Sequence, residues 1–140
     1  MGYRFLDHTA DLAVEVTAAT REELFGEALR ALTDSITPVD RIEPRVRRRI
    51  TLEASALDEL LLEWLSEAVA RFEIDGLLFR SARVELAESG EILRLTAVAE
   101  GEEYDPHRHP LKVLIKAVTY HGLEVERQGP GWRARIIFDI

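Results

Sequence analysis

The apolar residues of this 140-residue chain alternate between helical and strand-like periods, and this pattern constrains the fold more than any other feature. Thr20-Arg21-Glu22-Glu23 is a capping box, and the apolar residues after it recur at helical spacing until shortly before Pro38. This pattern predicts a helix over residues 20–35. A second, broader helical stripe follows Ser55, whose hydroxyl we expect to cap it, and ends near Asp75-Gly76.

The segments outside these helices show the alternation of short strands, with turn residues between them. Glu88-Ser89-Gly90 and Gly129-Pro130-Gly131 each separate two such segments and predict hairpins. The strands are expected at residues 3–6, 12–17, 45–52, 77–86, 92–99, 123–127 and 132–139.

A third helical pattern is shorter. After Pro110, apolar residues fall at helical spacing up to Val118, which favours a short helix over a strand. No repeat or linker interrupts the chain, so we expect one domain over residues 1–140. The sequence therefore predicts an α+β fold: a mostly antiparallel β-sheet with two main helices packed on it and a short third helix.

Composition limits the kinds of function. The chain has no cysteine, which excludes thiolate zinc sites and cysteine nucleophiles. Met1 to Phe5 lacks the apolar run of a signal peptide, and no segment is long enough to span a membrane, so we expect a cytoplasmic protein. The net charge of −8 argues against direct nucleic-acid binding, because that binding depends on clustered Lys and Arg. Any role near RNA should involve a partner protein.

Acidic residues lie close to both ends of the sequence. Asp7 and Asp11 share one predicted loop, and Asp139 precedes Ile140, whose α-carboxylate is a further oxygen donor. Two aspartates in one loop are about as often turn and capping residues as metal ligands, and terminal residues often fray. The apolar segment 132–138, however, would fix the terminus against the sheet. Asp11, Asp139 and the Ile140 carboxylate together predict an all-oxygen site for Ca²⁺, with Mg²⁺ or Mn²⁺ possible, in preference to zinc.

The histidines and one lysine are alternative functional residues. His107-Arg108-His109 has imidazoles for a transition metal, but the flanking prolines favour an exposed turn. His8 and His121 each suit a proton carrier or a histidine bonded to backbone. Lys116 would project from the short helix near His121, where it either binds a phosphate or partner carboxylate or is solvated.

Four sequence motifs together resemble the archease family over the whole length of the chain. They are Asp7-His8-Thr9-Ala10-Asp11, the helix with Glu22-Glu23-Leu24-Phe25, the stretch Lys116-Ala117-Val118-Thr119-Tyr120-His121-Gly122, and the closing Phe138-Asp139-Ile140. The resemblance implies a protein activator of the RtcB-type RNA ligase, which joins a 3′-phosphate or 2′,3′-cyclic phosphate end to a 5′-hydroxyl in tRNA splicing and RNA repair. The activator would promote guanylylation of the ligase histidine, allow multiple turnover and broaden nucleotide use, with GTP belonging to the ligase.

The resemblance also assigns the metal ligands to Asp11, Asp139 and Ile140, in agreement with the oxygen site argued from the residues. Asp7, His8, Lys116 and His121 are then candidate functional residues near that site, and the chain is not itself an enzyme. Two other functions remain open. One is a chaperone-like binding module for RNA-processing proteins, and the other is a small metal-dependent phosphohydrolase that uses the terminal carboxylates.

Overall fold

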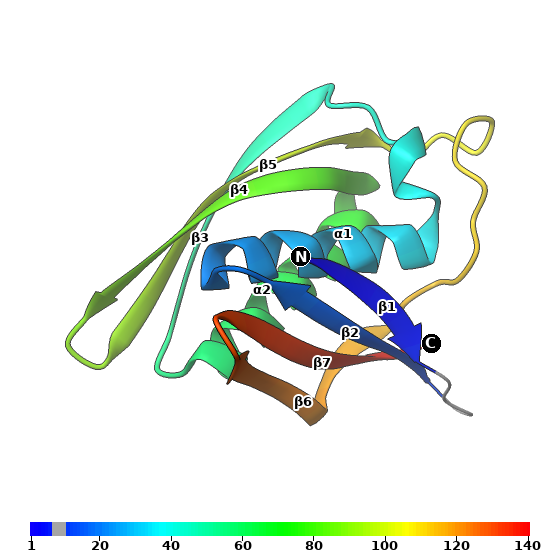
Figure 1. The fold of residues 1–140 in the computed structure, drawn as a ribbon. Helices are drawn as coiled ribbons and strands as arrows, with labels where there is room; N and C mark the ends of the chain where they lie inside the picture. The colour runs from blue at the N-terminus through cyan, green and yellow to red at the C-terminus, as the bar shows by residue number, and fades with distance from the viewer. Residues whose placement is uncertain (7–10) are drawn as a thin grey trace.

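The helices of this protein lie between two antiparallel sheets. The computed structural model describes residues 1–6 and 11–140, and Asp7 and His8 lie outside the described residues. We call the sheet of order β1-β2-β7-β6 the terminal sheet and the sheet of order β3-β5-β4 the hairpin sheet; α1 and α2 lie between them (Figure 1). The elements are β1 (Gly2–Leu6), β2 (Leu12–Ala18), α1 (Arg21–Ile36), η1 (Val39–Arg41), β3 (Val46–Ala54), α2 (Leu57–Asp75), β4 (Leu77–Ser89), β5 (Ile92–Glu103), β6 (Ala117–Gln128) and β7 (Gly131–Asp139).

The α+β class, the antiparallel pairing and the two main helices are confirmed, but the strands divide into two sheets instead of one. Both helices contribute to one core between the sheets. Trp64 of α2 and Phe25 of α1 are almost fully buried, and the Trp64 indole N–H donates to the Phe25 carbonyl at 2.9 Å. Burying a side chain of this size contributes about 2–3 kcal/mol. Within the described residues, no helix is long and apolar enough to cross a membrane.

The two helix starts differ from each other. Thr20 caps α1 as predicted, since its hydroxyl accepts from the Glu23 N–H at 3.1 Å. The cap predicted for α2 was wrong: the N-cap is Ala56, and the Ser55 hydroxyl donates to Glu59 Oε2 instead. Ser55 lies one position before the cap, too early in the chain for its hydroxyl to do the capping.

The predicted helix after Pro110 is also wrong. Residues 110–116 form neither helix nor strand, and β6 begins at Ala117. The Lys112 N–H donates to the Ile36 carbonyl at 2.7 Å and the Lys116 N–H to the Asp139 carbonyl at 2.8 Å. These long-range bonds use the amides that a helix would have needed. The segment instead fixes the end of α1 and the end of β7 to the start of β6.

Candidate functional site

The last strand is held inside the terminal sheet. β7 pairs with β2 on one side and with β6 on the other, so Phe138 faces Leu12 and Val118. Phe138 is fully buried, whereas Asp139 is exposed and its carbonyl accepts from the Lys116 N–H. The prediction that an apolar strand fixes the terminus is confirmed. The end of β7 also lies beside the end of β1 and the start of β2 (Figure 1).

Alternation along β7 selects the side chains on the outer face of the terminal sheet. Ile136 and Phe138 point into the core and are fully buried. Successive side chains of a strand point to opposite faces, so Arg135, Ile137 and Asp139 share the outer face. This face therefore carries an arginine and an aspartate on either side of an isoleucine.

Beside them, β6 contains a large bulge. Between the pairs Thr119–Ile137 and Glu124–Arg135, β6 advances five residues while β7 advances two. Gly122 lies in this bulge with φ of 80°, a left-handed conformation that favours glycine. A Cβ there would also lie 2.6 Å from Cδ1 of Ile137. Both constraints explain why this position is glycine.

Two hydrogen bonds fix the side of the bulge that carries His121. The His121 N–H donates to the Thr119 hydroxyl at 3.1 Å. The Tyr120 hydroxyl donates to Asp58 Oδ2 at 2.9 Å, and this bond raises the pKa of Tyr120 above its usual value. Asp58 lies in the first turn of α2. The bulge is thus tied both to itself and to the helix layer.

Predicted site residues meet in a hollow of about 490 Å³ next to this bulge. Asp11, Asp139 and His121 line it although they come from distant parts of the sequence. Lys116 contributes its backbone N–H to Asp139, and its side chain is exposed. Ile140 follows Asp139 directly and is 39% exposed. We call this hollow the terminal site; its polar lining residues are Asp11, Thr119, His121, Arg135 and Asp139.

The donor chemistry of the terminal site fits a hard divalent cation. Asp11 and Asp139 bring carboxylate oxygens to one hollow, and the Ile140 carboxylate is adjacent in the chain. Among residues 1–6 and 11–140, no three His, Asp or Glu side chains are grouped for a metal. In the predicted ligand set, the main-chain carboxylate of Ile140 is the third protein ligand.

Arg135 also lines the terminal site, and the sequence analysis missed it. The available signal was the period of a strand, because counting back from Asp139 in steps of two places Arg135 on the same face. The prediction of an exposed turn at His107-Arg108-His109 also needs correction. His107 is exposed, but His109 is fully buried, so the three residues 107–109 are not a single exposed turn.

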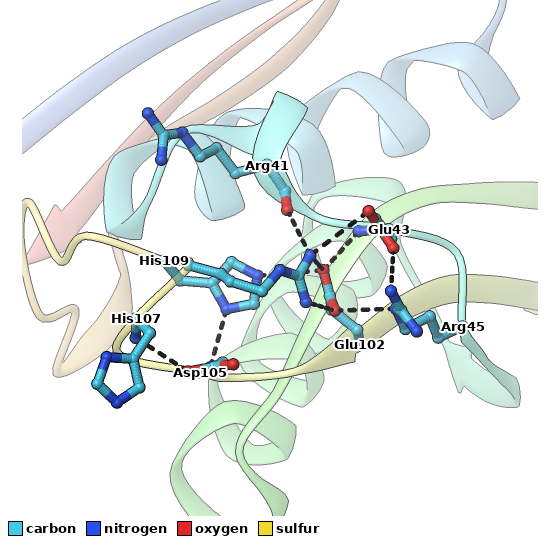
Figure 2. Close-up of polar contacts among 8 residues, drawn as sticks. Arg41, Glu43, Arg45, Glu102, Asp105, His107 and His109 are labelled. Carbon is cyan, nitrogen blue, oxygen red and sulfur yellow. Dashed lines mark hydrogen bonds and ion pairs between the residues drawn. The ribbon is translucent and has the colours of Figure 1, made fainter.

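His109 belongs to a second polar cluster, centred on buried Glu102 (Figure 2). Arg108 makes a two-pronged ion pair with Glu102, and the His109 Nε2 lies 3.1 Å from Glu102 Oε2. The Asp105 N–H donates to His109 Nδ1 at 2.9 Å, so the imidazole proton lies on Nε2. Both ring nitrogens are in use, which rules out His109 as a metal ligand in this arrangement. We call these residues the Glu102 cluster.

The carboxylate of Glu102 is fully engaged. Besides Arg108 and His109, it accepts from the Glu43 N–H at 2.7 Å. The Arg108 hydrogen bonds, opposed by burial, lower the pKa of Glu102 to about 2. Such an arrangement stabilises the junction between β5, the residues before β3 and the chain after β5.

Comparisons with known proteins agree over the full chain. The model of the archease protein family matches residues 3–140. The chain is 44% identical to the protein archease of Methanopyrus kandleri over 100% of both chains, and 34% identical to that of Pyrococcus abyssi over 96% and 95%. The solution structure of protein 1598 from Methanobacterium thermoautotrophicum matches with TM-score 0.83 and 30% identity over 99% of each chain. A crystal structure from Thermotoga maritima, described as an archease and possible chaperone, shares the fold with TM-score 0.61 and 20% identity over 96% and 94%.

Proposed function

The chain belongs to the archease family, and we propose that it activates an RtcB-type RNA ligase of tRNA splicing and RNA repair in the cytoplasm. The observation that carries this proposal is the meeting of Asp11, Asp139 and His121 in one hollow at the sheet surface. The activator would promote guanylylation of the ligase histidine and multiple turnover, and would broaden nucleotide use. GTP and the RNA belong to the ligase.

The role of the terminal site follows from its donors. Asp11, Asp139 and the Ile140 carboxylate would hold a divalent cation, with Ca²⁺, Mg²⁺ and Mn²⁺ the candidates. When bound, that cation would supply charge neutralisation for nucleotidyl transfer in the ligase. His121 lines the same hollow as the carboxylates and would be the proton carrier of the site. Lys116 is an exposed cation next to Asp139 and suits a carboxylate of the partner.

Exposed apolar side chains close in sequence to the residues of this site support a protein partner. Leu111 and Leu114 precede β6 and are 45% and 60% exposed, and Tyr120 in the bulge is 53% exposed. Ile140 adds a further exposed apolar side chain at the terminus. Exposed apolar side chains of this size are common in contacts with another protein. A partner bound over the site would exclude water from it.

The test is ligation of an RNA with a 2′,3′-cyclic phosphate by the cognate ligase at about tenfold substrate excess, which requires turnover. We expect multiple turnover and guanylylated ligase only when this protein is present. Asp139→Asn should lower the number of turnovers at least tenfold. The matched control is Asp40→Asn, an exposed aspartate in η1 outside the terminal site. An unchanged turnover and an unchanged level of guanylylated ligase would exclude the activator function.

The relative described as a possible chaperone favours a second candidate, a chaperone-like module for RNA-processing proteins. The exposed apolar residues named above also suit this function. It predicts that the protein suppresses aggregation of unrelated clients and that Asp139→Asn has no effect. Two measurements separate the two functions. They are light scattering of a heated client protein and the ligation assay, each with the wild type and with Asp139→Asn.

A further inference from the structure

Arg133 and Arg135 lie two residues apart on the same face of β7, yet their surroundings differ. Arg133 contacts three carboxylates: its Nε lies 2.9 Å from Glu15, and its Nη1 lies 3.3 Å from Glu124 and 3.2 Å from Glu126. These ion pairs join β2, β7 and β6 across the sheet. Arg133 is therefore a structural arginine.

Arg135 has glutamates as its register partners on both sides, Glu15 on β2 and Glu124 on β6. Both carboxylates form ion pairs with Arg133 instead. Arg133 makes the largest contribution to the lowered pKa of Glu15, followed by Arg4. Within the part of the chain that the structure describes, no ion pair or hydrogen bond joins the Arg135 side chain to a carboxylate.

The Arg135 guanidinium is directed to the terminal site by the bulge. Its Nη1 lies 3.5 Å from the position that a Cβ would take on Gly122, so the side chain rests over the bulged backbone. It lines the same hollow as Asp11 and Asp139. The site thus combines carboxylates that suit a cation with a guanidinium that suits an anion.

In this hollow the Arg135 guanidinium offers hydrogen-bond donors beside the cation that the carboxylates would hold. Phosphoryl oxygens coordinate hard cations and also accept two parallel hydrogen bonds from an arginine. We propose that Arg135 binds a phosphoryl group that shares the cation held by Asp11 and Asp139. This inference rests on the metal site of the proposed function and adds the class of its anionic ligand.

The experiment measures binding by calorimetry, without the ligase. Each protein is titrated with Mg²⁺ alone and then, at saturating Mg²⁺, with inorganic triphosphate. We expect Arg135→Gln to weaken triphosphate binding at least tenfold while Mg²⁺ binding stays equal or becomes tighter. Arg135→Lys should recover only part of the affinity, because an ammonium lacks the planar fork. Arg94→Gln, at an exposed arginine that pairs with Glu53 on the hairpin sheet outside the terminal site, is the control and should keep the wild-type triphosphate affinity.

Two further arms distinguish the source of the phosphoryl group. GTP tests a nucleotide, and a short oligoribonucleotide with a 3′-phosphate, compared with its 3′-hydroxyl form, tests an RNA end. A tenfold loss in Arg135→Gln for either ligand supports the inference and identifies the source.

Equal triphosphate affinity in wild type and Arg135→Gln, with Mg²⁺ bound by both, would overturn the role of Arg135 alone. Failure of the wild type to bind Mg²⁺ would overturn the metal site and this inference with it. Ligase activation is measured separately in the turnover assay. Failure of the proposed function and failure of this inference therefore give different results.

Discussion

The Glu102 cluster and the terminal site are both groups of charged side chains next to strand ends, but they are built in opposite ways. In the Glu102 cluster, one buried carboxylate accepts from Arg108, from the Glu43 N–H and from His109 (Figure 2). In the terminal site, Asp139 and His121 are exposed, and Arg135 is only partly buried. Saturated polar groups stabilise a fold, whereas charges left open to solvent are available to bind.

The largest expected effect is on the Glu102 cluster. Glu102→Ala should lower the free energy of unfolding by about 3 kcal/mol, because it leaves His109 and the Glu43 N–H without their acceptor. The matched control is Glu100→Ala, two residues away on β5, whose ion pair with Arg47 is exposed and worth less than about 1 kcal/mol. Urea unfolding measures the free energy of unfolding that each variant loses. Equal losses would mean that the buried Glu102 cluster stabilises the fold no more than an exposed ion pair does.

Acid should weaken the same cluster. The pKa of Glu102 is about 2 in the folded protein and has a reference value of 4.5. A lowered pKa means that the stabilisation is complete above the unfolded-state pKa and is lost as the pH falls from about 4.5 towards 2. By about pH 3 the loss from this group should reach about 2 kcal/mol.

Comparison with Glu102→Gln isolates that term, since glutamine does not titrate. Unfolding free energies of the two proteins should converge as the pH is lowered from neutral to about 3. Parallel curves over that interval would show that Glu102 is not the titrating group.

The bulge of the terminal site should depend on Gly122. Gly122→Ala places a side chain at a φ of 80° and against Ile137. It should lower the free energy of unfolding by about 2 kcal/mol. Gly90→Ala is the control: its φ is 63°, but a Cβ there meets no atom within 4 Å, so only the backbone cost of about 1 kcal/mol remains. Thermal unfolding measures both. A smaller loss for Gly122→Ala than for Gly90→Ala would mean that the bulge adapts to the side chain.

The local features of both regions follow from the sequence. Thr20 caps α1 as its capping box indicates, and the apolar residues before Asp139 anchor β7 in the core. Asp11 and Asp139 line one hollow, as the acidic residues near the two ends of the sequence suggested. The metal itself stays a prediction. These features depend on short-range spacing, which a single sequence displays directly.

The long-range features do not follow from spacing. Residues 110–116 have helical spacing, but their amides bond to the distant Ile36 and Asp139 carbonyls. His109 has polar and proline neighbours typical of a surface turn, but Glu102 and Asp105 make its burial favourable. The pairing of Glu15 and Glu124 with Arg133, and not with Arg135, likewise depends on the strand order β2-β7-β6. Such pairings are set by tertiary contacts, which the pattern of one segment does not contain.

The smallest expected effect on stability, at the terminal site, is the sharpest test of the comparison. Asp139 is exposed and shares its hollow with Asp11, so Asp139→Asn removes a charge that the fold does not need. Without added metal, its free energy of unfolding should differ from wild type by less than about 0.5 kcal/mol. Saturating Ca²⁺ at about 100 times its dissociation constant should then stabilise the wild type by about 2.7 kcal/mol and the variant far less. A metal-free loss as large as that of Glu102→Ala would mean that the terminal site, too, holds the fold together and that its open charges are not reserved for a ligand.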